Sequence, residues 1–364
     1  MLLWIGRKKQ KEAKVRIKIA DRVLSNSFWH SYLDVVFDFA QHHSDFLSFD
    51  IGEINKIINS AWLSGAVGRR RSYPDILKAS ARAANRSTPS DKTAVLIDDS
   101  AALEGSTEGT DVIRVHPYGA LVFLSQPFHL IVEDESSDGG FILWMARLLG
   151  NDQLKAAYLS GRLLFRHAGG KGQISKSARA LSYGVWPRDN RPIRSMKLRA
   201  AAILDSDSKY PGHSPNSQIR QDTLPHVAFV HILKGRTIEN YVPRKYMDRR
   251  LSAAGISSMV PDFFSLTEDE RNHFPMKKGF RDVADNPQTM AGFLADQRLP
   301  AEERNLYQVA SQQAWDRISC GFGERIGAVY MEPNYRCEPK ENSQLTPAQT
   351  AELEALLKAI IGLL

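Results

Sequence analysis

Between residues 126 and 235 the sequence alternates short apolar runs with longer amphipathic stretches, and this alternation constrains the fold most strongly. The runs "FHLIVED", "LLFRHAGG", "AAILDSD" and "HVAFVHIL" are rich in β-branched and apolar residues, as strands buried on both faces are. The intervening stretches, such as "GGFILWMARLLG", are typical of helices. We therefore expect an α/β domain with a parallel sheet covered by helices on both faces.

The residues before this domain follow two other patterns. Apolar residues at helical spacing in "SNSFWHSYLDVVFDFAQ" and "IGEINKIINSAWL" predict a mainly helical N-terminal region over residues 1–90. The stretch "NRSTPSDK" is typical of a linker and ends this region. Short apolar runs separated by turn residues then predict a small β-rich connector over residues 91–125.

The α/β domain is expected to extend over residues 126–280, followed by a helical C-terminal extension over residues 281–364. The last stretch, "TPAQTAELEALLKAIIGLL", begins with a Thr-Pro helix start and carries an apolar stripe at helical spacing. We expect this stripe to pack on the domain. Docking to a second subunit, which would make a homodimer, is the alternative.

Composition narrows the class of protein. The chain has 364 residues, of which 43% are hydrophobic and 24% charged, as in ordinary globular proteins. Its 48 basic against 41 acidic residues give a net charge of +7, which favours a polyanionic partner such as nucleic acid. Only Cys320 and Cys337 are present, which argues against a zinc site or a disulfide framework and for a reducing cytoplasm.

The sequence predicts no stable membrane insertion. No apolar run reaches the ~18 residues that a membrane helix requires. The N-terminal "MLLWIGRKKQK" places apolar residues before basic ones, the reverse of a secretory signal. It would contact a membrane surface weakly or, as we favour, form a first strand or frayed end before a solvated basic stretch.

Acidic residues follow three of the predicted strands. Glu133 ends the first, Asp205 and Asp207 end the third, and Glu239 follows the fourth. Because side chains alternate along a strand, Asp205 and Asp207 are expected to share one face. The carboxyl ends of parallel strands meet at one edge of a sheet, and Mg²⁺ prefers carboxylate oxygens. The sequence therefore predicts a Mg²⁺ (or Mn²⁺) site there, although any one of these acids would equally serve as a helix cap.

The order of these motifs resembles the Toprim fold, and in particular the branch found in OLD-family nucleases and related defence effectors. The resemblance covers residues 126–280 and is carried by Glu133, an acid at Asp138, "GGKG", the Asp-x-Asp strand end and "HILKGRTIENYVP". Two positions depart from the family pattern: Asp134 replaces a glycine, and Asp138 lies five rather than four residues after Glu133. The resemblance implies a Toprim-like, Rossmann-type sheet and an endonuclease that cleaves DNA or RNA in anti-phage defence.

The resemblance also implies roles for individual residues. Glu133, Asp205 and Asp207 would hold one or two Mg²⁺ or Mn²⁺ ions, with Asp138 as a further ligand. Glu239 would complete a second metal site or orient the attacking water. "HFPMKKGF" offers Lys277 and Lys278 for a lysine that would stabilise charge on the leaving oxygen. We favour Lys278, although a solvated basic turn explains this segment as well.

Basic and glycine-rich segments near these acids predict contact with a nucleic-acid backbone. The "GGKG" turn would either present backbone amides to an anion or only connect a strand to a helix. The basic residues of these segments carry positive charge, which suits a polyanionic backbone. The candidate nucleic-acid-binding residues are Lys171, Lys176, Lys234, Arg236, Arg244 and Lys245.

Two other functions are compatible with the sequence. "GKGQISKS" approaches the phosphate-binding P-loop pattern but has Ser175 at a glycine position, which leaves a nucleotide hydrolase as the second enzyme hypothesis. A Toprim-like module that binds nucleic acid or protein without cutting is the non-enzymatic alternative. Because OLD nucleases carry an ATPase domain fused to their Toprim domain, the resemblance also suggests a separate ATPase or sensor protein as partner.

Overall fold

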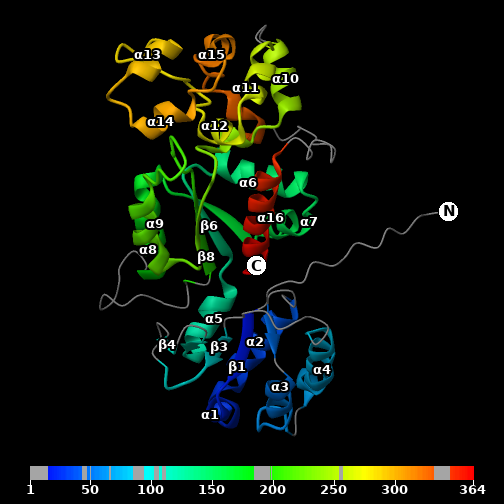
Figure 1. Cartoon of the computed structure of the whole chain (residues 1–364). Coiled ribbons are helices and arrows are strands. Elements are labelled where there is room, and N and C mark those ends of the chain that lie inside the picture. The colour runs from blue at the N-terminus through cyan, green and yellow to red at the C-terminus, as the bar shows by residue number, and fades with distance from the viewer. Residues whose placement is uncertain are drawn as a thin grey trace, which may run out of the picture.

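The computed structural model describes residues 15–42, 47–49, 51–64, 67–84, 94–101, 106–108, 112–183, 197, 199–253, 257–331 and 345–364. The N-terminal residues 1–14, the predicted linker and Cys337 lie outside these ranges. Within them the chain forms two α/β units, each built on its own sheet (Figure 1). No helix in these ranges combines the length and apolar character needed to cross a membrane.

The N-terminal unit contains a five-stranded sheet with the order β2-β1-β3-β5-β4. Its strands are parallel except β4, which pairs antiparallel with β5. Alternate residues of β1 and β5 are buried, as expected for strands that pack one face on a core. The elements are β1 (Val15–Ile19), α1 (Asp21–Ser25), η1 (Ser27–Trp29), α2 (His30–His42), β2 (Leu47–Phe49), α3 (Ile51–Ile58), η2 (Gly68–Ser72), α4 (Tyr73–Ala84), β3 (Ala94–Ile97), β4 (Ser106–Glu108), β5 (Val112–Val115) and α5 (Pro117–Ser125).

This unit corrects the predicted division near residue 90. β3 and β5 fall in the expected connector and β1 in the expected helical region, yet β3 pairs with both β1 and β5. Ile17 and Ile19 of β1 share a buried core with Val95 and Ile97 of β3. The helical pattern of residues 25–63 dominates the sequence before residue 90 and obscured the two short strands β1 and β2, which pair beside β3 in this sheet.

The second unit is built on four parallel strands with the order β7-β6-β8-β9. All residues of β8 are buried, which explains why this central strand is a continuous apolar run rather than an alternating one. The expected α/β class with a parallel sheet flanked by helices is confirmed. The elements of this layer are β6 (Phe128–Val132), α6 (Ser137–Leu148), α7 (Asp152–Leu159), β7 (Leu163–His167), η3 (Lys171–Gln173), α8 (Ile174–Tyr183), β8 (Ala200–Leu204), α9 (Ser217–Thr223), η6 (Leu224–His226), β9 (Val230–Ile232) and η7 (Ile238–Tyr241).

The strand order creates a switch point between β6 and β8. The chain moves from β6 outward to β7 and then crosses back to β8 on the other side of β6, so right-handed connections place α6 and α8 on opposite faces. The cores agree: Leu130 and Val132 pack with α6, whereas Ile131 packs with α8. In open parallel sheets ligands bind at the carboxyl ends of the strands beside such a switch point.

A helical layer covers the carboxyl edge of this sheet (Figure 1). The predicted boundary at residue 280 is wrong, because the Phe280 amide donates to the Ser319 carbonyl (2.8 Å) and its ring stacks on Trp315 within the same continuous core. The elements are α10 (Arg244–Ala253), α11 (Met259–Ser265), α12 (Glu268–His273), α13 (Met290–Ala295), α14 (Ala301–Leu306), α15 (Gln312–Ile318) and η8 (Ile326–Met331).

The C-terminal helix α16 (Pro347–Ile361) belongs to the second unit. A capping box between Thr346 and Gln349 begins it, with a proline in its first turn. Its apolar residues Leu353, Leu356, Leu357 and Ile360 enter the core formed with β6, α6 and α7. The expectation that this stripe packs on the domain is confirmed.

Candidate active site

Five carboxylates lie at the carboxyl edge of the second sheet. Glu133 follows β6, Asp138 lies in the first turn of α6, Asp205 and Asp207 follow β8, and Glu239 lies in η7. We call them the carboxylate cluster. Burial and then the charges of Asp138, Glu239, Asp207 and Glu133 raise the pKa of Asp205 well above its ordinary value. The structure therefore brings all five predicted acidic residues together.

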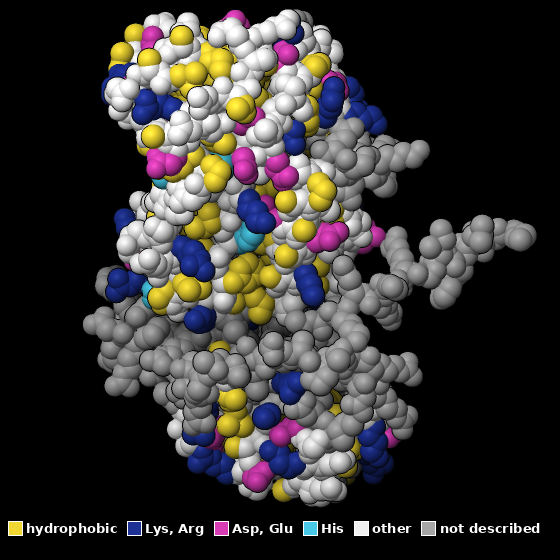
Figure 2. All heavy atoms as spheres, in the orientation of Figure 1, with side chains coloured by type: hydrophobic (Ala, Val, Ile, Leu, Met, Phe, Trp, Pro, Cys, Tyr) yellow, Lys and Arg dark blue, Asp and Glu magenta, His cyan; other side chains and the backbone are white. Residues whose placement is uncertain are grey.

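Three acids of the cluster, Glu133, Asp138 and Asp205, are costly to ionise. Burial, and beyond it the charges of Glu133 and Asp134, raise the pKa of Asp138 to about 6. Burial likewise raises the pKa of Glu133, with Asp207 adding to the shift and Lys171 opposing it. Such like-charge groups beside one another favour a bound cation. Figure 2 shows acidic side chains gathered where the sheet layer meets the helical layer.

Asp205 and Asp207 are placed by a turn rather than by strand alternation. β8 ends at Leu204, and Asp207 adopts φ = 52°, in the left-handed region that non-glycine residues seldom occupy. The predicted reason for their shared direction was therefore wrong, although both side chains reach the cluster. The Asp207 amide donates to the Arg236 carbonyl (2.8 Å), which holds this conformation. Strained backbone of this kind is concentrated at functional sites.

The "IENY" segment forms η7 and makes hydrogen bonds to the sheet edge, to the helical layer and to α16. The Ile238 amide donates to Asp205 Oδ1 (3.0 Å), and Glu239 is a member of the cluster. Asn240 Nδ2 donates to the carbonyls of Arg271 (2.7 Å) and Phe274 (3.0 Å) in the helical layer. The Tyr241 hydroxyl donates to Glu352 Oε2 of α16 (2.7 Å). The segment therefore joins the sheet edge, the helical layer and the C-terminal helix.

Two lysines and an asparagine contact the cluster. Lys171 Nζ lies 2.6 Å from Asp207 Oδ2, and Asn216 Nδ2 donates to the same oxygen at 2.8 Å. Lys277 Nζ lies 3.0 Å from Glu239 Oε1. The predicted Lys278 is exposed and makes no ion pair with any residue that the structure describes. Its neighbour Lys277 is therefore the lysine that faces the carboxylates.

The donor set suits a hard divalent cation. No three His, Cys, Asp or Glu side chains within the described ranges are arranged to hold a metal ion, and lysine ammonium groups pair with Asp207 and Glu239. Glu239 Oε2, however, is buried without a hydrogen-bond partner among the described residues. A Cβ at Gly327 would lie 2.6 Å from Glu239 Oε1, so the glycine leaves room for this carboxylate. Carboxylate oxygens with an unused buried acceptor fit Mg²⁺ or Mn²⁺ in kind.

The "GGKG" turn serves the cluster directly. Gly169 and Gly170 have φ of 80° and 101°, which glycine adopts without strain. The Lys171 amide donates to the Glu133 carboxylate, and its ammonium contacts Asp207. Lys176 and Ser177 lie inside α8, and the Ser177 hydroxyl accepts from Arg166 Nε (3.0 Å). The P-loop alternative loses support, because the loop amide and the serine are already engaged.

The remaining predicted basic residues lie farther along the chain surface. Lys176 and Lys234 are exposed on α8 and in the loop before η7, and Lys245 is exposed on α10. Arg244 pairs with Asp248 (3.8 Å) and lies over the Phe264 ring (5.4 Å). Of the six predicted nucleic-acid-binding residues, we therefore assign direct contact with the cluster to Lys171, while Arg236 contacts Asp207 through its backbone.

Asn216 and Glu352 were missed at the sequence level, and Lys278 was favoured over Lys277. Asn216 lies in the polar loop after Asp207, where no pattern distinguishes it from its neighbours. Lys277 and Lys278 are adjacent identical residues, so only the turn between α12 and α13 decides which one faces inward. Glu352 did carry a signal, because it lies four residues before Leu356 on the apolar face of α16, where an acid is unexpected.

No family model, curated protein or solved structure matches this chain. The function proposed below therefore depends on the geometry and chemistry of the carboxylate cluster.

Proposed function

We propose that this chain is a metal-dependent endonuclease that cleaves phosphodiester bonds of DNA or RNA at the carboxylate cluster. One observation carries the proposal: acids from separate segments converge at the switch point of a parallel sheet, where burial and the neighbouring acids raise the pKa of Asp205 and Asp138. A chain selected only for stability has no reason to keep this repulsion. A divalent cation and a phosphate substrate provide one.

Within this proposal Glu133, Asp138, Asp205, Asp207 and Glu239 would hold Mg²⁺ or Mn²⁺. The bound metal would lower the pKa of a water molecule and neutralise charge on the scissile phosphate. Asn216 orients Asp207 through its 2.8 Å hydrogen bond, and the Ile238 amide orients Asp205. Lys277, held beside Glu239, supplies a positive charge for the leaving oxygen.

The Toprim-like assignment of the fold belongs to this proposal. It is supported by the parallel sheet with Glu133 and the Asp-x-Asp segment at neighbouring strand ends and by the structural roles of "IENY". A role in anti-phage defence, and a separate ATPase or sensor as partner, are implied by the sequence resemblance alone and are proposed on that basis.

Cleavage is tested with the purified full chain and labelled single- and double-stranded DNA and RNA. We expect products with Mg²⁺ or Mn²⁺ and none with chelator, because the cluster binds substrate phosphate only when a cation offsets its charge. Binding without cleavage under every metal condition, alone or with copurified partners, would support the non-cleaving module instead. Hydrolysis of ATP with release of phosphate, in the absence of any nucleic-acid cleavage, would overturn the nuclease assignment.

Lys277→Ala is expected to lower kcat for cleavage roughly 10²-fold, the order found when one preorganised electrostatic group is removed. Its adjacent control, Lys278→Ala, is expected to retain wild-type kcat, because Lys278 lies outside the cluster. Steady-state kinetics at saturating metal measure both. A larger loss in Lys278→Ala than in Lys277→Ala would show that the ion pair with Glu239 does not identify the functional lysine.

A further inference from the structure

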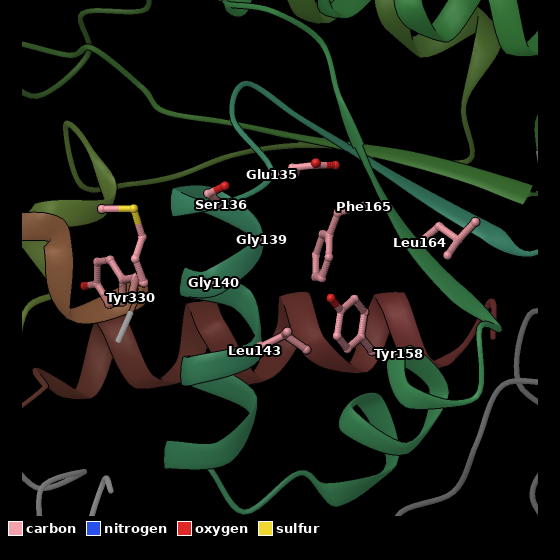
Figure 3. A pocket seen from close by; sticks show the side chains of 10 residues that line it. Glu135, Ser136, Gly139, Gly140, Leu143, Tyr158, Leu164, Phe165 and Tyr330 are labelled. Carbon is pink, nitrogen blue, oxygen red and sulfur yellow. The ribbon is translucent and has the colours of Figure 1, made fainter. Parts of the chain in front are cut away.

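A cavity of about 580 Å³ lies between α6, the edge strand β7 and η8 (Figure 3). Its volume falls within the range of about 300–1,000 Å³ of small-ligand pockets. Tyr158, Phe165 and Tyr330 supply aromatic surface, and leucine and methionine side chains add to the lining. Among the residues that the structure describes, no lysine or arginine lines it, whereas Glu135 does. The cavity therefore suits a flat, uncharged group better than a phosphate.

Two glycines of α6 set the shape of the cavity. A Cβ at Gly139 would lie 2.9 Å from Phe165 Cγ, and one at Gly140 would lie 2.2 Å from the Tyr330 carbonyl oxygen. Figure 3 shows Tyr330 on one side of α6 and Phe165 with Tyr158 on the other. The rings of Tyr158 and Phe165 are 5.5 Å apart between centroids. The glycines thus let aromatic walls approach the helix from both sides.

Two segments of the chain contribute both to the lining of the cavity and to the surroundings of the carboxylate cluster. Glu135 and Ser136 line it and belong to the turn that joins Glu133 to Asp138. On the other side, the Tyr330 hydroxyl donates to the Ile238 carbonyl (3.0 Å), and the Ile238 amide donates to Asp205. η8 also places Gly327 against Glu239. A phosphate at the cluster would therefore have this cavity as its neighbour.

We infer that the cavity holds an unpaired nucleobase of the substrate strand, adjacent to the phosphate at the carboxylate cluster. This inference rests on the proposed function and defines its substrate class. Bases stack on aromatic side chains irrespective of sequence, and the Glu135 carboxylate accepts hydrogen bonds from N–H groups on a base edge. A base inside a duplex is stacked and paired and cannot enter such a cavity. The substrate is therefore single-stranded or carries an extrahelical nucleotide.

The test measures binding separately from cleavage. Full-length Asp205→Asn protein, in which cleavage is disabled, is titrated with single-stranded DNA and RNA oligonucleotides that contain 2-aminopurine. Matched arms are the same strand in a duplex, a strand with an abasic site at the probe position, and free 2-aminopurine nucleotide. Tyr158→Ala in this background removes one aromatic wall, and Leu159→Ala is its control, because Leu159 is adjacent, 71% exposed and not part of the lining.

We expect the single strand to bind with quenched 2-aminopurine fluorescence and the duplex to bind at least about tenfold more weakly. Tyr158→Ala should weaken single-strand binding roughly tenfold, the order of one lost base-stacking contact, and leave the abasic strand unaffected. Leu159→Ala should change neither. Quenching of the free nucleotide at similar concentration would show that the base alone is recognised, whereas quenching confined to the oligonucleotide would show that the adjacent phosphates are also required; either supports a base site.

Equal affinity of Tyr158→Ala and its parent for single strands, or a duplex bound as tightly as a single strand, would overturn the base site. The base site would also be overturned if nucleic acid displaced no probe from the cavity while an apolar peptide bound there. These results are distinguishable from failure of the nuclease proposal. If the otherwise wild-type chain cleaves with metal while Tyr158→Ala cleaves equally fast, the base site alone fails; if Tyr158-dependent binding occurs without any cleavage, only the nuclease assignment fails.

Discussion

Asp205→Asn is expected to impair metal-dependent cleavage severely while making the protein more stable. Asp205 lies at the centre of the carboxylate cluster, and its pKa is raised by burial and by four neighbouring acids, so its ionised form is unfavourable in the metal-free fold. The amide keeps the shape, and its oxygen can still accept from the Ile238 amide, but it removes the charge. We expect cleavage to fall roughly 10²- to 10³-fold and metal-free stability to rise by about 0.5–2 kcal/mol.

The gain in stability should depend on pH in one direction. The folded-state pKa of Asp205 is raised, so below its unfolded-state pKa of about 4 both states are protonated and Asp205 carries no penalty. As the pH rises above that value, the unfolded chain ionises first, and wild type loses stability relative to the variant. The difference between the two proteins should therefore be absent near pH 3 and grow towards neutral pH.

Thermal unfolding in chelator across this pH range, with cleavage assays in Mg²⁺, measures both effects. Asp222→Asn is the matched control, because Asp222 is an exposed acid on α9 of the same unit. It should leave activity and the pH profile unchanged. A destabilised Asp205→Asn protein, or one with wild-type cleavage, would contradict the assignment of Asp205 to a cation site.

Glu352→Ala is expected to destabilise the second unit by about 1–3 kcal/mol for each buried donor that it leaves unsatisfied. Glu352 of α16 is buried and accepts hydrogen bonds from the Lys234 amide (2.8 Å) and the Tyr241 hydroxyl (2.7 Å), and it contacts His231 Nε2 (3.0 Å). Its loss leaves these buried donors without an acceptor. Because Tyr241 belongs to η7, cleavage should also fall.

Urea unfolding followed by circular dichroism measures this effect. Glu354→Ala is the control on the same helix, since Glu354 is exposed two residues away. It should shift the midpoint little. The N-terminal unit has a separate core, so any transition assigned to it should be unaffected by Glu352→Ala. Equal midpoints for Glu352→Ala and Glu354→Ala would contradict the buried role of Glu352.

The second sheet was predictable because its signals are local. Continuous apolar runs such as β8 identify buried parallel strands, and an acid directly after such a run lies at the sheet's carboxyl edge. The N-terminal sheet was not predictable in the same way. β1 alternates partly buried and buried residues from Arg16 to Ile19, and its partner β3 lies beyond a long helical stretch. Pairing between strands that are so far apart in the sequence produces no recognisable pattern within either strand.

The residues of the candidate site were likewise predictable only where their sequence signals are local. Glu133, Asp205, Asp207 and Glu239 were identifiable from strand ends, and the structure brings them together. Whether Asp138 joins them depended on the conformation of the turn after Glu133, where the Asp134 amide donates to Asp138 Oδ2 (2.9 Å). In this turn Asp138 lies close enough to Asp205 for its charge to act on that carboxylate.

By itself, therefore, the sequence determined the parallel α/β class of the second unit and the acids at its strand ends, because hydrophobic periodicity and strand termini are properties of neighbouring residues. Only the tertiary structure decided that Lys277 rather than Lys278 faces Glu239, and that Glu352 anchors η7 across more than a hundred residues of sequence. These contacts depend on turn conformations and on the packing of distant segments. The direction of a side chain in a turn and the contacts between distant segments are both established only when the chain folds and its core packs.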